Sequence, residues 1–95
     1  MITSKQRAKL KSISHNIKPI INIGKNGISD NLMIQINDLL EAREIIKIKI
    51  LSNNLDKSKN LINSIIKETN SEFIQFLGNI ITIYRKSKKN QKIEL

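Results

Sequence analysis

Apolar residues recur at helical spacing in the first part of the chain. Leu10, Ile13 and Ile17 fall on one stripe of a helix with 3.6 residues per turn. The segment Thr3-Ser4-Lys5-Gln6 has the spacing of a capping box, which satisfies two backbone amides at a helix start. Pro19 disfavours helical conformation in the residue before it, so the sequence predicts that this first helix ends within the three residues before the proline.

The same spacing predicts two further helices. The second is expected to begin at Ser29 or Asp30, either of which can cap it, and to run to about Ala42. The third is expected near residues 56–69. In the second helix, Ile34 is predicted to point away from the apolar face. The residues predicted to face the core are Ile28, Leu32, Ile36, Leu39 and Leu40 in the second helix, and Leu61, Ile62, Ile65 and Ile66 in the third.

Strands are predicted where apolar and polar residues alternate or β-branched residues gather. Residues 44–51 alternate, and residues 19–23 are short, β-branched and bounded by proline and glycine. Residues 73–77 and 80–85 flank Gly78-Asn79, which has the composition of a two-residue hairpin turn. In the alternating segment, one side is predicted to carry Ile46, Ile48 and Ile50 and the other side Lys47 and Lys49.

These elements predict a two-layer α/β fold with the order α-β-α-β-α-β-β. Asn53-Asn54 separates the second strand from the third helix. The first two strands are joined by a crossover helix and should be parallel, whereas the closing hairpin is antiparallel, so the sheet is expected to be mixed. A length of 95 residues fits one domain, expected over residues 1–86, followed by a basic and frayed tail at 87–95.

Charge is unevenly distributed along the chain, which has a net charge of +9. Residues 1–29 hold six basic residues and no acid. Lysine supplies 14 of the 17 basic residues, and its codons are rich in A and T, so codon bias is an alternative explanation for the lysine content. The separation of charges nevertheless favours a polyanionic partner over a generally solvated surface.

Catalytic chemistry has little support in the sequence. There is no cysteine, and the one histidine, His15, stands at the end of the first helix. Asp38, Glu41 and Glu44 are three residues apart on the outer side of the second helix, where solvation is expected. Phosphate-loop, dinucleotide and nucleophile-elbow motifs are absent from the sequence. We therefore expect no enzymatic activity, no cofactor and no metal.

The loop Gly24-Lys25-Asn26-Gly27 is the main candidate for binding. Its glycines allow a sharp turn and a close approach of the backbone to a ligand, and the following helix offers free amides. Lys25 adds a positive charge and Asn26 a hydrogen-bond donor, which suits nucleic acid phosphates. An ordinary turn between a strand and a helix is the alternative.

A wider basic surface is expected around this loop. Only three aromatic residues, Phe73, Phe76 and Tyr84, are present, and at least one phenylalanine is needed in the core. Binding is therefore expected to depend on phosphate, 2′-hydroxyl and shape more than on base stacking. The further cations predicted to contact nucleic acid are Lys5, Arg7, Lys9, Lys47, Lys49, Arg85 and Lys86.

Five short motifs, taken in order, give the chain a close resemblance to a known family. They are Lys5-Gln6-Arg7 with Leu10, Lys18-Pro19, Ile23-Gly24-Lys25-Asn26-Gly27-Ile28, Glu44-Ile45-Ile46-Lys47-Ile48-Lys49, and Leu77-Gly78 with Tyr84-Arg85. With these motifs the chain resembles the CRM domain in its free-standing bacterial form, the YhbY-type RNA-binding proteins. The resemblance implies a four-stranded mixed sheet similar to the C-terminal domain of translation initiation factor three. It also implies RNA contact through the GxxG loop and association with precursors of the large ribosomal subunit.

The expected function is RNA binding by a monomeric protein. No apolar run approaches the length of about 18 residues needed to span a membrane, and residues 1–20 lack the apolar core of a signal peptide, so a cytoplasmic protein is expected. Two alternatives stay open. One is a protein-interaction module that docks a partner through Ile34 or the acidic end of the second helix, and the other is a DNA-binding protein without sequence specificity.

Overall fold

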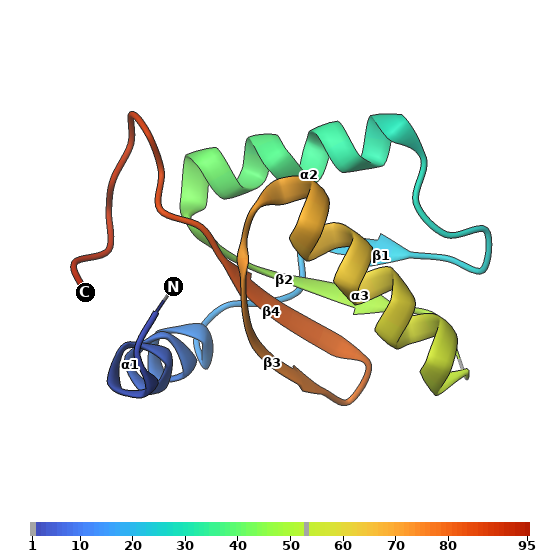
Figure 1. Ribbon diagram of the computed structural model, residues 1–95, viewed down its shortest axis with the longest axis horizontal. Helices are drawn as coiled ribbons and strands as arrows, with labels where there is room; N and C mark the ends of the chain where they lie inside the picture. Colours follow the sequence, from blue (N-terminus) through green and yellow to red (C-terminus); the bar gives the residue numbers. More distant parts are fainter. Residues whose placement is uncertain (1, 53) are drawn as a thin grey trace.

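The computed structural model describes residues 2–52 and 54–95, and its elements follow the predicted α-β-α-β-α-β-β order (Figure 1). Asn53, half of the predicted Asn53-Asn54 break, lies outside the described residues. No helix within the described ranges is long and apolar enough to cross a membrane. The elements are α1 Ser4–Ser14, β1 Ile21–Ile23, α2 Asp30–Arg43, β2 Ile45–Ile50, α3 Leu55–Thr69, β3 Glu72–Leu77 and β4 Ile80–Tyr84.

The four strands form the predicted mixed sheet, and their spatial order is β1-β2-β4-β3. β1 runs parallel to β2, whereas β4 is antiparallel to both β2 and β3. Ile48 in β2 lies beside Ile21 on one side and Ile81 on the other, so the centre of the sheet is a row of buried isoleucines. The sheet is therefore stabilised by apolar burial as well as by its backbone hydrogen bonds.

Helices lie on both faces of the sheet (Figure 1). α2 and α3 cover one face and enclose the main core, in which Ile36 and Ile65 meet the strands. α1 lies on the other face, where Leu10 joins Ile45 and Tyr84 in a smaller apolar cluster. The sequence predicted a helical layer on a sheet without indicating which helices form it; α2 and α3 form that layer, and α1 partly covers the opposite face.

The helix ends follow local sequence chemistry. Thr3 and Gln6 form the predicted capping box, and of the two candidate caps for α2 it is Ser29 whose side chain accepts a hydrogen bond from the backbone amide of Leu32. α1 ends at Ser14, slightly earlier than predicted, and the buried hydroxyl of Ser14 donates to the carbonyl of Lys11 in the last turn.

The C-terminal tail has no helix or strand, although it is attached to the body of the protein. The backbone amides of Lys88 and Lys89 donate to Glu41, and those of Ser87, Lys92 and Ile93 donate to Glu44. The expectation of a frayed tail came from composition alone. Composition does not show that two carboxylates of α2 and its cap can accept hydrogen bonds from the backbone amides of the tail.

The prediction that the acidic residues of α2 are solvated is wrong for Glu44. Glu44 is fully buried and stands at the C-terminal cap of α2 with a φ of 67°, a conformation that usually favours glycine. Helical periodicity placed it on the outer side, but the chain leaves the helix at this residue, and the side chain turns towards the tail.

Candidate functional site

The glycine-bracketed loop between β1 and α2 is a tight turn. The amide of Gly27 donates to the carbonyl of Gly24 over 3.1 Å, and Gly27 has a φ of +78°, in the left-handed region. A Cβ atom at Gly24 would meet nothing within 4 Å. The turn therefore needs glycine at position 27 for its backbone, whereas the fold leaves open space at position 24.

This loop forms one wall of a cleft of about 380 Å³ whose other wall is the first half of α3. The cleft lies where the parallel strands β1 and β2 end, since the amide of Leu51 donates to the carbonyl of Ile23 over 2.8 Å. Such crevices at the carboxyl ends of parallel strands are common ligand sites in α/β proteins. The polar residues lining it are Lys25, Asn26, Ser52, Lys57, Ser58, Asn60 and Ser64.

Lys57 is a cation that the sequence reasoning did not select. It lies in the first turn of α3 and lines the cleft opposite Lys25. The predicted parallel pairing of β1 and β2 could have identified it, because that pairing brings the start of the helix after β2 beside the loop after β1.

Lys47 and Lys49 lie on the face of β2 opposite the main core, as predicted. Ile45, on the same face, belongs to the apolar cluster beneath α1, while Ile50 at the other end of the strand lines the glycine-loop cleft. Lys49 is paired with Asn22, two residues before the loop. The two lysines therefore lie between α1 and the loop along one strand.

The predicted cations of α1 are at the other end of the molecule from the glycine loop (Figure 1). Lys5 is exposed. The Nε of Arg7 donates to the carbonyl of Phe73 over 3.2 Å, and the Nζ of Lys9 donates to the carbonyl of Glu94. The structure thus gives Arg7 and Lys9 contacts within the chain that the sequence does not reveal.

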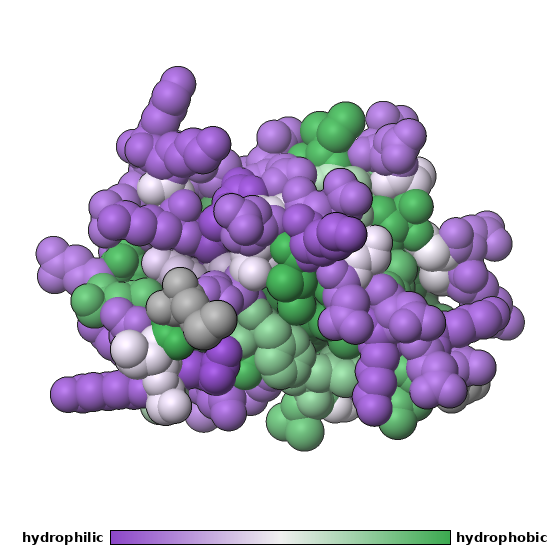
Figure 2. Space-filling model, viewed as in Figure 1, coloured by the Kyte–Doolittle hydropathy of each residue, from purple (hydrophilic) through white to green (hydrophobic). Residues whose placement is uncertain are grey.

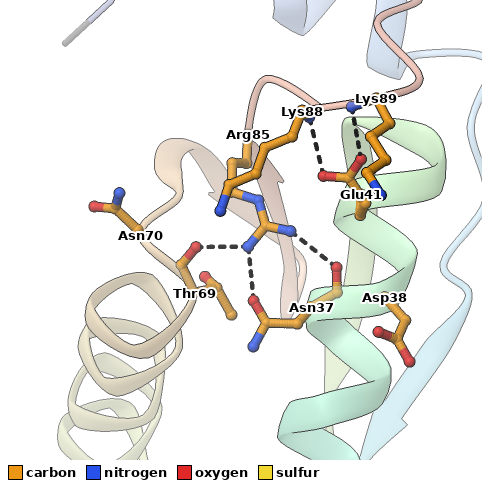
Figure 3. Close-up of a pocket in the computed structure, with 8 residues that line it drawn as sticks. All are labelled: Asn37, Asp38, Glu41, Thr69, Asn70, Arg85, Lys88 and Lys89. Atoms are coloured by element: carbon orange, nitrogen blue, oxygen red, sulfur yellow. Dashed lines mark hydrogen bonds between the residues drawn. The ribbon is translucent and has the colours of Figure 1, made fainter.

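Arg85 connects α2 with the end of α3 (Figure 3). Its Nη1 donates to Oδ1 of Asn37 over 2.6 Å and to the carbonyl of Thr69 over 2.9 Å, and its Nη2 donates to the carbonyl of Asn37 over 3.0 Å. These bonds occupy much of the guanidinium, whereas the neighbouring predicted residue, Lys86, is exposed. Arg85 therefore has a clear structural role, whatever it contacts outside the chain.

The two carboxylates that hold the tail have lowered pKa values. Hydrogen bonds from the Lys88 amide, the Ser87 hydroxyl and the Lys89 amide lower the pKa of Glu41 to about 2. Figure 3 shows the two that come from the lysine amides. For Glu44, burial raises the pKa, but three tail amides together outweigh burial and lower it. Both groups are held as carboxylates, which strengthens their hydrogen bonds to the tail.

Metal chemistry finds no support among the side chains. Across residues 2–52 and 54–95, no group of three or more histidine, cysteine, aspartate or glutamate side chains could hold a metal ion.

The surface in Figure 2 is mainly hydrophilic, with a hydrophobic strip between α3 and β3. The glycine loop, its cleft and the β2 lysines form the main candidate site.

These features define a small, basic α/β domain with an exposed GxxG loop. The family model described as "CRS1 / YhbY (CRM) domain" matches residues 2–85. The chain therefore belongs to the CRS1/YhbY (CRM) domain family, in agreement with the resemblance seen in its motifs.

Relatives along the whole length support this assignment. The Bacillus subtilis protein named "Probable RNA-binding protein YqeI" is 40% identical over 95 residues, covering 100% of this chain and 99% of the relative. A Haemophilus influenzae protein named "RNA-binding protein" is 31% identical, covering 99% of this chain and 94% of the relative. The solution structure of the Staphylococcus aureus protein SAV1595 matches with a TM-score of 0.84 and 49% identity, covering 100% of this chain and 99% of that structure.

Proposed function

We propose that this protein is an RNA-binding factor that associates with precursors of the large ribosomal subunit in the cytoplasm. It acts as a monomer without catalysis and grips the RNA backbone through the GxxG loop. The names of its relatives and its family resemblance support RNA as the partner. Association with precursors of the large ribosomal subunit is supported only by the family resemblance.

The geometry of the loop is the observation that carries the proposal. Gly24 leaves open space above the backbone, Lys25 is exposed, and Lys57 faces the loop across the cleft. Two cations on opposite walls suit a phosphate group, and the lack of a side chain at Gly24 lets the RNA backbone approach closely.

The lysines of β2 extend this site across the sheet. Residues two apart on one face of a strand are separated by about 7 Å, so Lys47 and Lys49 present a short row of charges pointing the same way. This row runs from the end of β2 that lies beneath α1 to Asn22 beside the loop. In the proposal, RNA phosphates follow this row, while Arg85 mainly holds α2 and α3 in place.

The direct test is a charge reversal in the loop. Replacing Lys25 and Asn26 together with aspartate should reduce the affinity for a large-subunit ribosomal RNA fragment at least tenfold, because phosphate contacts dominate such affinities. The thermal midpoint should stay nearly unchanged, since both side chains are exposed. Fluorescence anisotropy and thermal melts measure the two quantities.

A matched control separates local contact from the loss of overall charge. Lys18 and Asn16 are also exposed, and replacing both with aspartate changes the net charge by the same amount. The control should bind RNA much more tightly than the loop variant. Equal affinities for the two variants would remove the loop from the mechanism, and stronger competition by duplex DNA than by structured RNA would favour a DNA-binding protein.

The structure gives less support to docking through the acidic end of α2. Glu41 and Glu44 accept hydrogen bonds from the chain's own tail. Ile34 remains exposed at 58% of its surface, but an isolated exposed isoleucine is common on soluble proteins.

A further inference from the structure

A second groove lies on the other side of α3 from the glycine-loop cleft. Its volume is about 320 Å³, and its walls are α3 and the edge strand β3. Figure 2 shows the hydrophobic strip between these two elements, surrounded by hydrophilic side chains. The groove is lined by Lys59, Ile62, Asn63, Ile66, Phe73 and Phe76.

An irregularity in β3 places both phenylalanines in this groove. In a regular strand, residues three apart point to opposite faces of the sheet. Here Phe73 pairs with Ile83 and Gln75 pairs with Thr82, so one extra residue is inserted between them. The resulting bulge turns Phe73 to the same face as Phe76, and bulges of this kind often redirect a side chain at a functional site.

The two rings differ in how they are used. Phe76 packs against the main core, whereas Phe73 leaves 39% of its surface exposed. Arg7 holds the backbone beside the exposed ring through its hydrogen bond to the Phe73 carbonyl. An aromatic ring that is held in place but not buried can stack on a flat ligand.

The polar groups around the ring indicate what kind of ligand this is. Asn63 offers an amide that can donate and accept at the edge of a base, and Lys59 offers a cation for its phosphate. An aromatic face combined with an amide and a basic residue is the combination by which proteins bind unpaired bases of single-stranded RNA. An apolar protein segment would leave Lys59 and Asn63 without a role.

We propose that the groove between α3 and β3 binds one unpaired nucleobase of the RNA, stacked on Phe73. This inference rests on the proposed RNA binding and extends it. Because α3 forms a wall of both clefts, one RNA strand can cross the helix from the GxxG loop to Phe73, with Asn60 on the loop side and Asn63 on the ring side. Base stacking then adds to the phosphate contacts, although the small number of aromatic residues in the sequence gave no reason to expect it.

The test compares an RNA with bases and a backbone without them. Affinities of oligoadenylate and of an abasic ribose-phosphate oligomer of the same length are measured at low salt by fluorescence anisotropy. Phe73→Ala should weaken oligoadenylate binding about tenfold and leave abasic binding unchanged, and Phe73→Tyr should retain the wild-type affinity for both. Leu77→Ala is the matched control, since Leu77 is an exposed apolar residue on the same strand, with 72% of its surface accessible.

Each contrary outcome has a distinct meaning. Wild-type affinity of Phe73→Ala for oligoadenylate would overturn the nucleobase site and leave the proposed function standing. Equal losses for both oligomers would also overturn it, because they would indicate a general defect. Phe73 ring signals in the NMR spectrum that do not shift when oligoadenylate is added would also overturn the nucleobase site. An apolar protein segment would then be the better candidate ligand for the groove. Failure of the wild-type protein to bind either oligomer would contradict the proposed function itself.

Discussion

At the scale of single residues, the two glycines of the loop have different roles. Gly27 adopts a left-handed conformation that the turn requires, while Gly24 has neither a positive φ nor a close neighbour. The sequence predicted both glycines as one motif. It could not separate the residue needed for folding from the residue available for ligand contact, because the difference depends on backbone angles and surrounding space.

This difference predicts that alanine at one glycine affects stability and alanine at the other affects RNA binding. Gly27→Ala should lower the free energy of unfolding by about 1 kcal/mol, because an L-residue is strained in the left-handed region. Gly24→Ala should leave the free energy of unfolding within about 0.5 kcal/mol of wild type and weaken RNA binding, because its methyl group obstructs the phosphate backbone. Chemical denaturation and RNA titration check both, and unchanged RNA binding by Gly24→Ala would show that the backbone makes no close approach there.

At the scale of elements, periodicity predicted the helices and strands but not how their ends are joined. The isoleucines of β2 and the caps of α1 and α2 are determined by neighbouring residues, which is why they could be predicted. The bulge in β3 and the tail contacts of Glu44 depend on partners far along the chain. Residues whose roles come from such long-range contacts, including Arg85, were therefore interpreted as part of a solvated or RNA-binding surface.

The tail contacts make stability depend on pH in the acid range. The pKa of Glu41 is lowered from 4.5 to about 2, and that of Glu44 is lowered as well, so the unfolded state binds more protons at low pH. Their contribution is present above about pH 4.5 and is lost as the pH falls towards 2. Thermal melts across this range should show a falling midpoint, and the fall should be smaller in Glu41→Gln.

A substitution at Glu44 tests the same attachment at neutral pH. Glu44→Gln replaces the carboxylate that accepts hydrogen bonds from three tail amides with a neutral side chain. This substitution should lower the free energy of unfolding by about 1–3 kcal/mol. The control is Glu68→Gln on the exposed side of α3, which should change little. Equal stability of the two variants would show that the attachment of the tail to Glu44 contributes nothing to stability.

At the scale of the whole molecule, the predicted basic surface is only partly continuous. The glycine loop and α1 lie at opposite ends, and β2 joins them through Lys47 and Lys49 (Figure 1). Charge segregation along the sequence indicated a polyanion partner, but it could not show which cations share a face. The structure adds Lys57 to the loop and gives Arg85, Arg7 and Lys9 contacts within the chain.

The most direct measurement is the salt dependence of RNA affinity for the wild type and for Lys47→Gln/Lys49→Gln. Each phosphate contact contributes about −0.7 to −0.9 to the slope of log affinity against log salt concentration. The double variant should therefore have a slope shallower by about 1.4 to 1.8, whereas a Lys18→Gln/Lys67→Gln control should keep the wild-type slope. A wild-type affinity that does not change with salt, or the same slope for wild type and the β2 variant, would contradict backbone recognition along this strand.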